Sequence, residues 1–135
     1  MATAPDSLES GSRLRDLIRS NLEAVEKGLG LFTDSQGNAG LDYQTPLGPI
    51  DIVATDSRGG LVIVKLQEGA GSTADLIGNL CAQMGWAQEA LAGKREVRGI
   101  VLTQAAPEQL KYAVKAVPGI QLMEYEFKFE IRPVA

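Results

Sequence analysis

The sequence contains no histidine and only one cysteine among its 135 residues. Without histidine there is no imidazole base, no serine–histidine nucleophile and none of the usual zinc ligand sets. The single cysteine, Cys81, excludes an internal disulfide, and its apolar helical context predicts a buried small side chain. Any chemistry must therefore depend on carboxylates, lysine or amides.

Long apolar runs and excess positive charge are also missing. No stretch approaches the roughly 20 apolar residues of a membrane helix, and Met1 to Ser12 resemble neither a secretory signal nor a transit peptide. We therefore expect a cytoplasmic protein with no membrane partner. The formal net charge is -4, which is the wrong sign for holding phosphate backbones by bulk electrostatics. Nucleic-acid binding would require a local basic patch.

What the sequence does contain fits one globular domain, which we place at 13–135 after a flexible tail at 1–12. From Ser12 to Lys27, apolar residues recur with a helical period, and Gly28 stands where a C-cap glycine belongs. The first ordered element is thus predicted to be an amphipathic helix.

The rest of the chain alternates between strand and helix patterns. Short runs rich in strand formers are bounded by turn residues, and two of them flank a glycine-containing turn, which predicts an antiparallel hairpin. This order of elements predicts an α/β fold with a mixed central sheet flanked by helices. The predicted strands are 30–33, 40–44, 49–55, 61–67, 97–102, 121–124 and 127–131, and the predicted helices are 72–92 and 107–117.

Polar residues in the predicted hairpin are candidates for a functional site. Asp51 is a lone acid in an otherwise apolar strand, where it is either held by loop amides or acts as a metal ligand. In the second strand, period-two alternation places Lys65 and Gln67 on one face. Taken alone, Lys65 is interpreted as a solvated strand residue.

Four motifs follow one another along the chain in a specific order. With them the chain resembles the catalytic domain of the NucS-type (EndoMS-like) PD-(D/E)xK nucleases, over roughly Leu14 to Arg132 and without that family's separate N-terminal DNA-binding domain. The resemblance implies a restriction-endonuclease-like fold. The motifs are Glu26-Lys27-Gly28-Leu29, the segment Tyr43-Gln44-Thr45-Pro46-Leu47-Gly48-Pro49-Ile50-Asp51, Lys65-Leu66-Gln67 and Met84-Gly85-Trp86.

In that family, the strand Asp and the Glu of a Glu-x-Lys motif bind magnesium or manganese, a helix Glu assists, and the lysine acts on the attacking water. Carried over by position, Glu26 and Asp51 persist, and they are the metal ligands if a metal is bound. Lys65 stands in place of the ligating Glu, and Gln67 in place of the lysine. Because a cation at a ligand position repels the metal, the resemblance implies a vestigial site. We further predict that the Lys65 ammonium occupies the metal's place and pairs with Asp51, with Glu26 as a second partner.

The long helix carries the second-line residues of the site. By the same resemblance, Asn79 and Gln83 replace two polar side chains that point toward it, although both also fit solvent-facing amides. Trp86 is interpreted as a packing residue. Six basic residues are candidates for a nucleic-acid patch, and the first three also fit a solvated helix face: Arg13, Arg15, Arg19, Lys94, Arg95 and Arg98.

The function implied is a non-catalytic nuclease-fold domain that binds nucleic acid or a protein partner and needs no cofactor. The alternative is a DNA endonuclease that depends on magnesium or manganese and has a rearranged active site. A homodimer is a further prediction, because related nucleases often pair.

Overall fold

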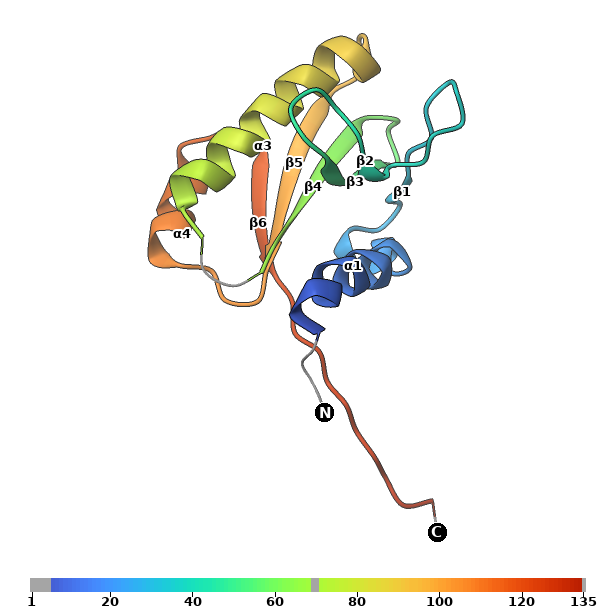
Figure 1. The fold of residues 1–135 in the computed structure, drawn as a ribbon, viewed down its shortest axis with the longest axis vertical. Coiled ribbons are helices and arrows are strands. Elements are labelled where there is room, and N and C mark those ends of the chain that lie inside the picture. The colour runs from blue at the N-terminus through green and yellow to red at the C-terminus, as the bar shows by residue number, and fades with distance from the viewer. Residues whose placement is uncertain (1–5, 69–70, 135) are drawn as a thin grey trace.

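The computed structural model describes residues 6–68 and 71–134, and within them the chain forms one sheet with helices on both faces (Figure 1). The predicted α/β architecture is confirmed. No helix in this part of the chain is long and apolar enough to span a membrane. The elements are α1 (Asp6–Arg19), α2 (Leu22–Val25), β1 (Gly30–Leu31), β2 (Leu41–Tyr43), β3 (Ile50–Thr55), β4 (Leu61–Gln67), α3 (Thr73–Ala87), the π-helical turn η1 (Gln88–Ala92), β5 (Val97–Thr103), α4 (Glu108–Lys115) and β6 (Ile120–Glu124).

The sheet is mixed, with the strand order β1-β3-β4-β5-β6 and with β2 also paired to β3. The strands β1, β2 and β4 all run antiparallel to β3, as the hairpin pattern predicts for β3 and β4. The pairs β4–β5 and β5–β6 are parallel, because α3 and α4 carry the chain back across the sheet between them. Since β4 lies between β3 and β5, its first four residues are fully buried.

The alternation of side chains along β4 divides the core into two layers. Ile63 faces α3 and α4 and belongs to the same cluster as Leu80. Val64 faces α1 and α2 and belongs to the same cluster as Leu14. Lys65 follows Val64, so its side chain leaves the sheet on the α3 side.

The N-terminal helix starts earlier than predicted. The sequence pattern favours a start at Ser12 after a flexible tail, whereas α1 is helical from Asp6. The part of the predicted tail at 1–5 lies outside the described residues. Most residues before Leu14 are small and polar, so no apolar stripe marks this first stretch of helix.

The same helix also ends earlier than predicted, at Arg19 instead of Lys27. The Asn21 side-chain amide donates to the carbonyl oxygen of Leu17 (2.8 Å) and closes the end of α1. A side chain that bonds the backbone in this way competes with the helical ladder, and apolar spacing does not reveal it. The short α2 then leads to Gly28, which has the positive φ (87°) expected of a turn glycine.

The long helix begins as predicted, with the Ser72 hydroxyl accepting the backbone N–H of Asp75 (3.2 Å), and it reaches Ala92 through η1. The predicted burial of Cys81 is wrong, because its side chain is exposed. The buried face of α3 instead passes through Leu80 and the residues one turn before and after it.

The strand predicted at 127–131 does not form. The sheet ends at β6, after which Tyr125 donates one more backbone N–H bond, to the carbonyl oxygen of Thr103 (3.0 Å). In the part of the chain that the structure describes, no strand pairs with the residues beyond, and Figure 1 shows them extending away from the sheet. The alternating pattern of 127–131 is typical of a strand, but a strand also needs a neighbouring edge to pair with.

Candidate functional site at the start of β3

A closed turn positions Asp51 at the start of β3. The Thr45 hydroxyl donates to the carbonyl oxygen of Gly48 (2.6 Å) and accepts the backbone N–H of Leu47 (3.0 Å). Gly48 has a φ of 103°, in the region that favours glycine. Ile50, next to Asp51, is only 1% exposed and fixes the strand in the core. The Thr-Pro-x-Gly sequence therefore forms the turn that places Asp51 at the start of β3.

The tyrosine of the same motif is held by packing and by one strong hydrogen bond. The Tyr43 ring contacts Phe32 and Trp86, with ring centroids 6.2 and 6.4 Å apart, which confirms the packing role of Trp86. The Tyr43 hydroxyl donates to Oδ2 of Asp34 (2.8 Å), and Oδ1 of Asp34 accepts the backbone N–H of Asn38 (2.8 Å). The Asn38 and Tyr43 bonds lower the pKa of Asp34 from 3.8 to about 2, whereas burial and Asp34 raise the pKa of Tyr43 to about 12.

This pair makes part of the stability dependent on acid pH. Because the pKa of Asp34 is about 2 in the folded protein and 3.8 otherwise, its contribution is complete above pH 3.8 and is lost as the pH falls through 2. We expect the difference in unfolding free energy between the wild type and Asp34→Asn to shrink across this interval. Denaturant titrations of both proteins at several acidic pH values measure it. A difference that is constant with pH would contradict the assignment.

The Asp51 carboxylate is half-buried and has two partners. Its Oδ2 accepts the backbone N–H of Leu66 (2.9 Å), and its Oδ1 lies 3.9 Å from a guanidinium nitrogen of Arg15 on α1. The sequence left two alternatives for Asp51, hydrogen bonds from loop amides or a role as a metal ligand. In the structure its carboxylate accepts a backbone N–H, and this N–H comes from β4 instead of a loop.

Lys65 does not form the predicted ion pair. The paired register of β3 and β4 ends at Ile52 and Val64. Ile50 and Ile52 belong to different layers of the core, so the regular alternation is interrupted at Asp51 and does not set it on the same face as Lys65. Among residues 6–68 and 71–134 no ion pair within 4.0 Å joins Lys65 to a carboxylate. The physical reason is that Lys65 leaves the sheet on the α3 side, whereas α1 brings Arg15 to Asp51 from the other side. Arg15 is therefore the cation beside Asp51.

Glu26 lies in a different place from the one predicted. Its carboxylate forms an ion pair with Arg98, whose guanidinium also contacts Oδ2 of Asp56 (3.3 Å). Asp56 follows β3, whereas Asp51 begins it. Five residues of extended strand span roughly 16 Å, so Glu26 is bound at the opposite end of β3 from Asp51.

The contacts within the Glu26–Arg98–Asp56 cluster shift the pKa values of Arg98 and Asp56. The bond to Glu26 raises the pKa of Arg98 against the effect of burial, and Asp56 adds to the rise. Burial opposes ionisation of Asp56, but the backbone N–H groups of Gly60 and Arg58 and the Arg98 guanidinium outweigh it and lower the pKa. Arg98 is the shared cation between two carboxylates, which is the arrangement of a structural ion-pair cluster.

The two helix amides differ from each other. Asn79 is exposed, as its solvent-facing interpretation predicts, whereas Gln83 is 5% exposed. The Gln83 side-chain N–H donates to the carbonyl oxygen of Pro49 (3.2 Å), which ties α3 to the turn before Asp51. The Oε1 of Gln83 is buried without a hydrogen-bond partner among the described residues.

The donor set around Asp51 does not fit a divalent cation of the magnesium type. Such an ion prefers several oxygen ligands with a net negative charge. Asp51 provides one carboxylate, but Arg15 lies beside it and Glu26 is engaged elsewhere. Within the described ranges, no group of three or more histidine, cysteine, aspartate or glutamate residues is placed to hold a metal ion.

Two residues of these clusters carry no sequence signal that assigns them to a site. The sequence pattern marks Arg15 and Arg98 only as candidates for a basic patch, whereas both contact carboxylates. Arg95 is also engaged, since it donates to the carbonyl oxygens of Leu91 (2.7 Å) and Ala92 (3.2 Å). The helical spacing of Arg15 relative to the apolar face of α1 indicates that it lies near the sheet. The spacing does not show which acid of the sheet it contacts.

The order of elements and the mixed sheet with helices on both faces define a restriction-endonuclease-like fold of the NucS type. A structure of EndoMS in complex with double-stranded DNA matches with a TM-score of 0.69 and 18% identity, over 96% of this chain and 49% of that one. A repair endonuclease from Pyrococcus abyssi gives a TM-score of 0.67 and 19% identity, over 91% and 50%. EndoMS in its apo form gives a TM-score of 0.63 and 18% identity, over 93% of this chain and 49% of that one.

The comparisons concern the fold of about half of each neighbour, because this chain spans about half the length of the structures it matches. No protein-family model and no curated protein matches the sequence. The chain is thus a nuclease-fold domain, and what it does depends on its own residues.

Proposed function

We propose that this chain is a non-catalytic nuclease-fold domain that serves as a binding module. The observation that carries the proposal is the environment of Asp51, whose ionic partner is Arg15 at 3.9 Å. In a metal-dependent nuclease, this carboxylate must help neutralise a phosphate through a bound cation and lower the pKa of the attacking water. A guanidinium beside it supplies charge compensation without a metal, and Lys65 adds a second cation on the neighbouring strand.

A protein partner agrees better with the surface than a nucleic acid does. The net charge is -4, and three of the six candidate basic residues, Arg15, Arg95 and Arg98, make internal contacts. Phosphate backbones need clustered positive charge. Exposed large apolar side chains, by contrast, mark protein contacts, and Phe127 and Phe129 are 57% and 88% exposed.

Metal ions should leave the stability of the wild type unchanged. Only a ligand that prefers the folded state raises the melting temperature, and among the described residues no cluster of metal-ligating side chains forms at Asp51. We expect equal melting temperatures in millimolar magnesium, in millimolar manganese and in a chelator. The measurement is differential scanning calorimetry, with Asp51→Asn as the matched control. A rise in the wild type that Asp51→Asn abolishes would contradict the proposal.

Metal-dependent cleavage of DNA is the second candidate function. Two observations favour it. Asp51 stands at the start of β3, and the Oε1 of Gln83, buried beside the same turn, has no hydrogen-bond partner within residues 6–68 and 71–134. The test is incubation with branched, mismatched and single-stranded DNA in the presence of magnesium or manganese. Cleavage that disappears in Asp51→Ala would establish this candidate and remove the first. Binding at low salt without cleavage would identify DNA as the partner of a non-catalytic module.

A further inference from the structure

The chain after β6, residues 125–134, forms an exposed arm that we call the C-terminal arm. Phe127, Phe129 and Ile131 in it are 57%, 88% and 82% exposed. No strand in the described part of the chain pairs with the arm beyond Tyr125, and Figure 1 shows it extending away from the sheet. An extended segment with open backbone groups and exposed aromatic side chains is suited to pairing with another strand.

The arm has two chemically different faces. The rings of Tyr125 and Phe127 lie 5.3 Å apart, which places these alternate residues on one side. Glu130 and Arg132 form an ion pair (2.8 Å), which places these two alternate charged residues on one side as well. Because side chains of an extended segment alternate, this spacing gives the arm an apolar face and a charged face. The apolar face consists of Tyr125, Phe127, Phe129 and Ile131, and the charged face of Glu126, Lys128, Glu130 and Arg132.

We propose that the arms of two copies of this chain pair antiparallel about a two-fold axis at Phe129. In this register each Glu126 lies opposite Arg132 of the second copy, and each Lys128 lies opposite Glu130. Every charged residue therefore faces the opposite charge, and the symmetry makes each contact occur twice. The apolar residues meet on the other face, where the two Phe129 rings lie opposite each other.

The charge pattern selects this register over its neighbours. A slip of two residues one way places Lys128 opposite itself, and a slip the other way places Glu130 opposite itself. A slip of one residue places charged side chains opposite apolar ones. Parallel pairing in register sets like charges side by side. Like charges directly opposite one another destabilise a strand pair, so the arm is complementary to a second copy of itself in one arrangement.

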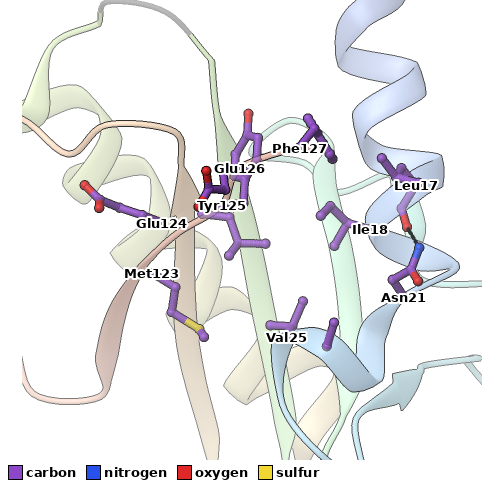
Figure 2. A pocket seen from close by; sticks show the side chains of 11 residues that line it. Leu17, Ile18, Asn21, Val25, Met123, Glu124, Tyr125, Glu126 and Phe127 are labelled. Carbon is purple, nitrogen blue, oxygen red and sulfur yellow. Dashed lines mark hydrogen bonds between the residues drawn. The ribbon is translucent and has the colours of Figure 1, made fainter. Parts of the chain in front are cut away.

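An apolar groove beside the arm supports the same arrangement. It has a volume of about 300 Å³, and Phe127 lines it together with Leu17, Val25 and Met123 (Figure 2). In the proposed register, Ile131 of the second copy lies opposite Phe127. The second arm thus brings an apolar side chain to the rim of the groove, where Leu17 is 44% exposed.

The pairing can be tested with charge reversals on the wild-type background. Lys128→Glu places two acids opposite each other twice per dimer, and Glu130→Lys does the same with two bases. For each variant alone, the dissociation constant of the dimer should be at least roughly tenfold higher than that of the wild type. An equimolar mixture of the two should form heterodimers as stable as the wild-type dimer, because all four pairs are then oppositely charged. Sedimentation velocity over a range of concentrations measures all three states.

Lys111→Glu is the matched control, because it makes the same charge change at an exposed position of α4, outside the arm. It should dimerise as the wild type does. The proposal is overturned if the wild type stays monomeric at high concentration, if the single variants dimerise normally, or if the mixture of variants stays monomeric. The assay contains neither metal nor DNA, so its result does not depend on whether the Asp51 site is catalytic.

Discussion

Combining Lys65→Glu, Gln67→Lys and Arg15→Gln should produce a protein whose melting temperature rises with magnesium or manganese. The first two changes place a carboxylate and a lysine on β4, the strand paired with β3, and the third removes the guanidinium that lies 3.9 Å from Asp51. Two carboxylates on adjacent strands repel each other unless a cation lies between them. Binding of a divalent ion relieves this repulsion in the folded state alone, so the metal stabilises the fold.

Linkage gives the size of the effect. At a metal concentration one hundred times the dissociation constant, the folded state gains about 2.7 kcal/mol. For a chain of this length, the melting temperature should rise by about 10 °C, because about 1 kcal/mol corresponds to roughly 4 °C. Calorimetry with and without the ion measures the shift, and isothermal titration gives the dissociation constant.

Two further variants separate a metal site from a general effect of salt. Adding Asp51→Asn to the triple variant should abolish the metal response, because one of the two ligands is lost. Leaving Arg15 unchanged should weaken the response, because the guanidinium competes with the ion for Asp51. A folded triple variant without any metal response would show that the start of β3 is not a vestigial metal site.

Gly40→Ala should remove a large fraction of the free energy of unfolding of the protein. A Cβ atom at Gly40 would lie 2.2 Å from the carbonyl oxygen of Val53 and 3.0 Å from its carbonyl carbon. Backbone atoms cannot move aside as a flexible side chain can. The same glycine holds two short backbone bonds, from its N–H to the carbonyl oxygen of Phe32 (2.7 Å) and from the N–H of Val53 to its own carbonyl oxygen (2.7 Å).

We expect Gly40→Ala to cost on the order of 3 kcal/mol, the upper range for forcing a group into a packed site. Urea titration followed by circular dichroism measures the loss. The matched control is Gly78→Ala on α3, where no atom lies within 4 Å of the new Cβ. That change should raise stability by about 0.5–1 kcal/mol, because alanine is the better helix former. Equal stabilities for the two variants would contradict the close approach at Gly40.

The hairpin of β3 and β4 could be predicted from the sequence because its signals are local. Gly59 and Gly60 mark the turn, and period-two alternation sets which face each side chain takes. The register that follows pairs Ile52 with Val64, but the alternation is interrupted at Asp51, which the local pattern does not reveal. The motif around Gly48 was informative for the same reason, since a tight turn needs particular residues at fixed positions.

The residues that surround the carboxylates depended on tertiary structure. Asp51 and Arg15 come together only because α1 packs across the sheet, and Glu26 is drawn to Arg98 because α2 ends beside the far end of β3. A sequence pattern records the spacing of residues within one element, whereas an ion pair between elements depends on how they pack. The fold, the hairpin and the position of Asp51 were therefore determined by the sequence pattern itself. Which cation neutralises Asp51 was decided by the packing of α1, since charge interactions act through space and not along the chain.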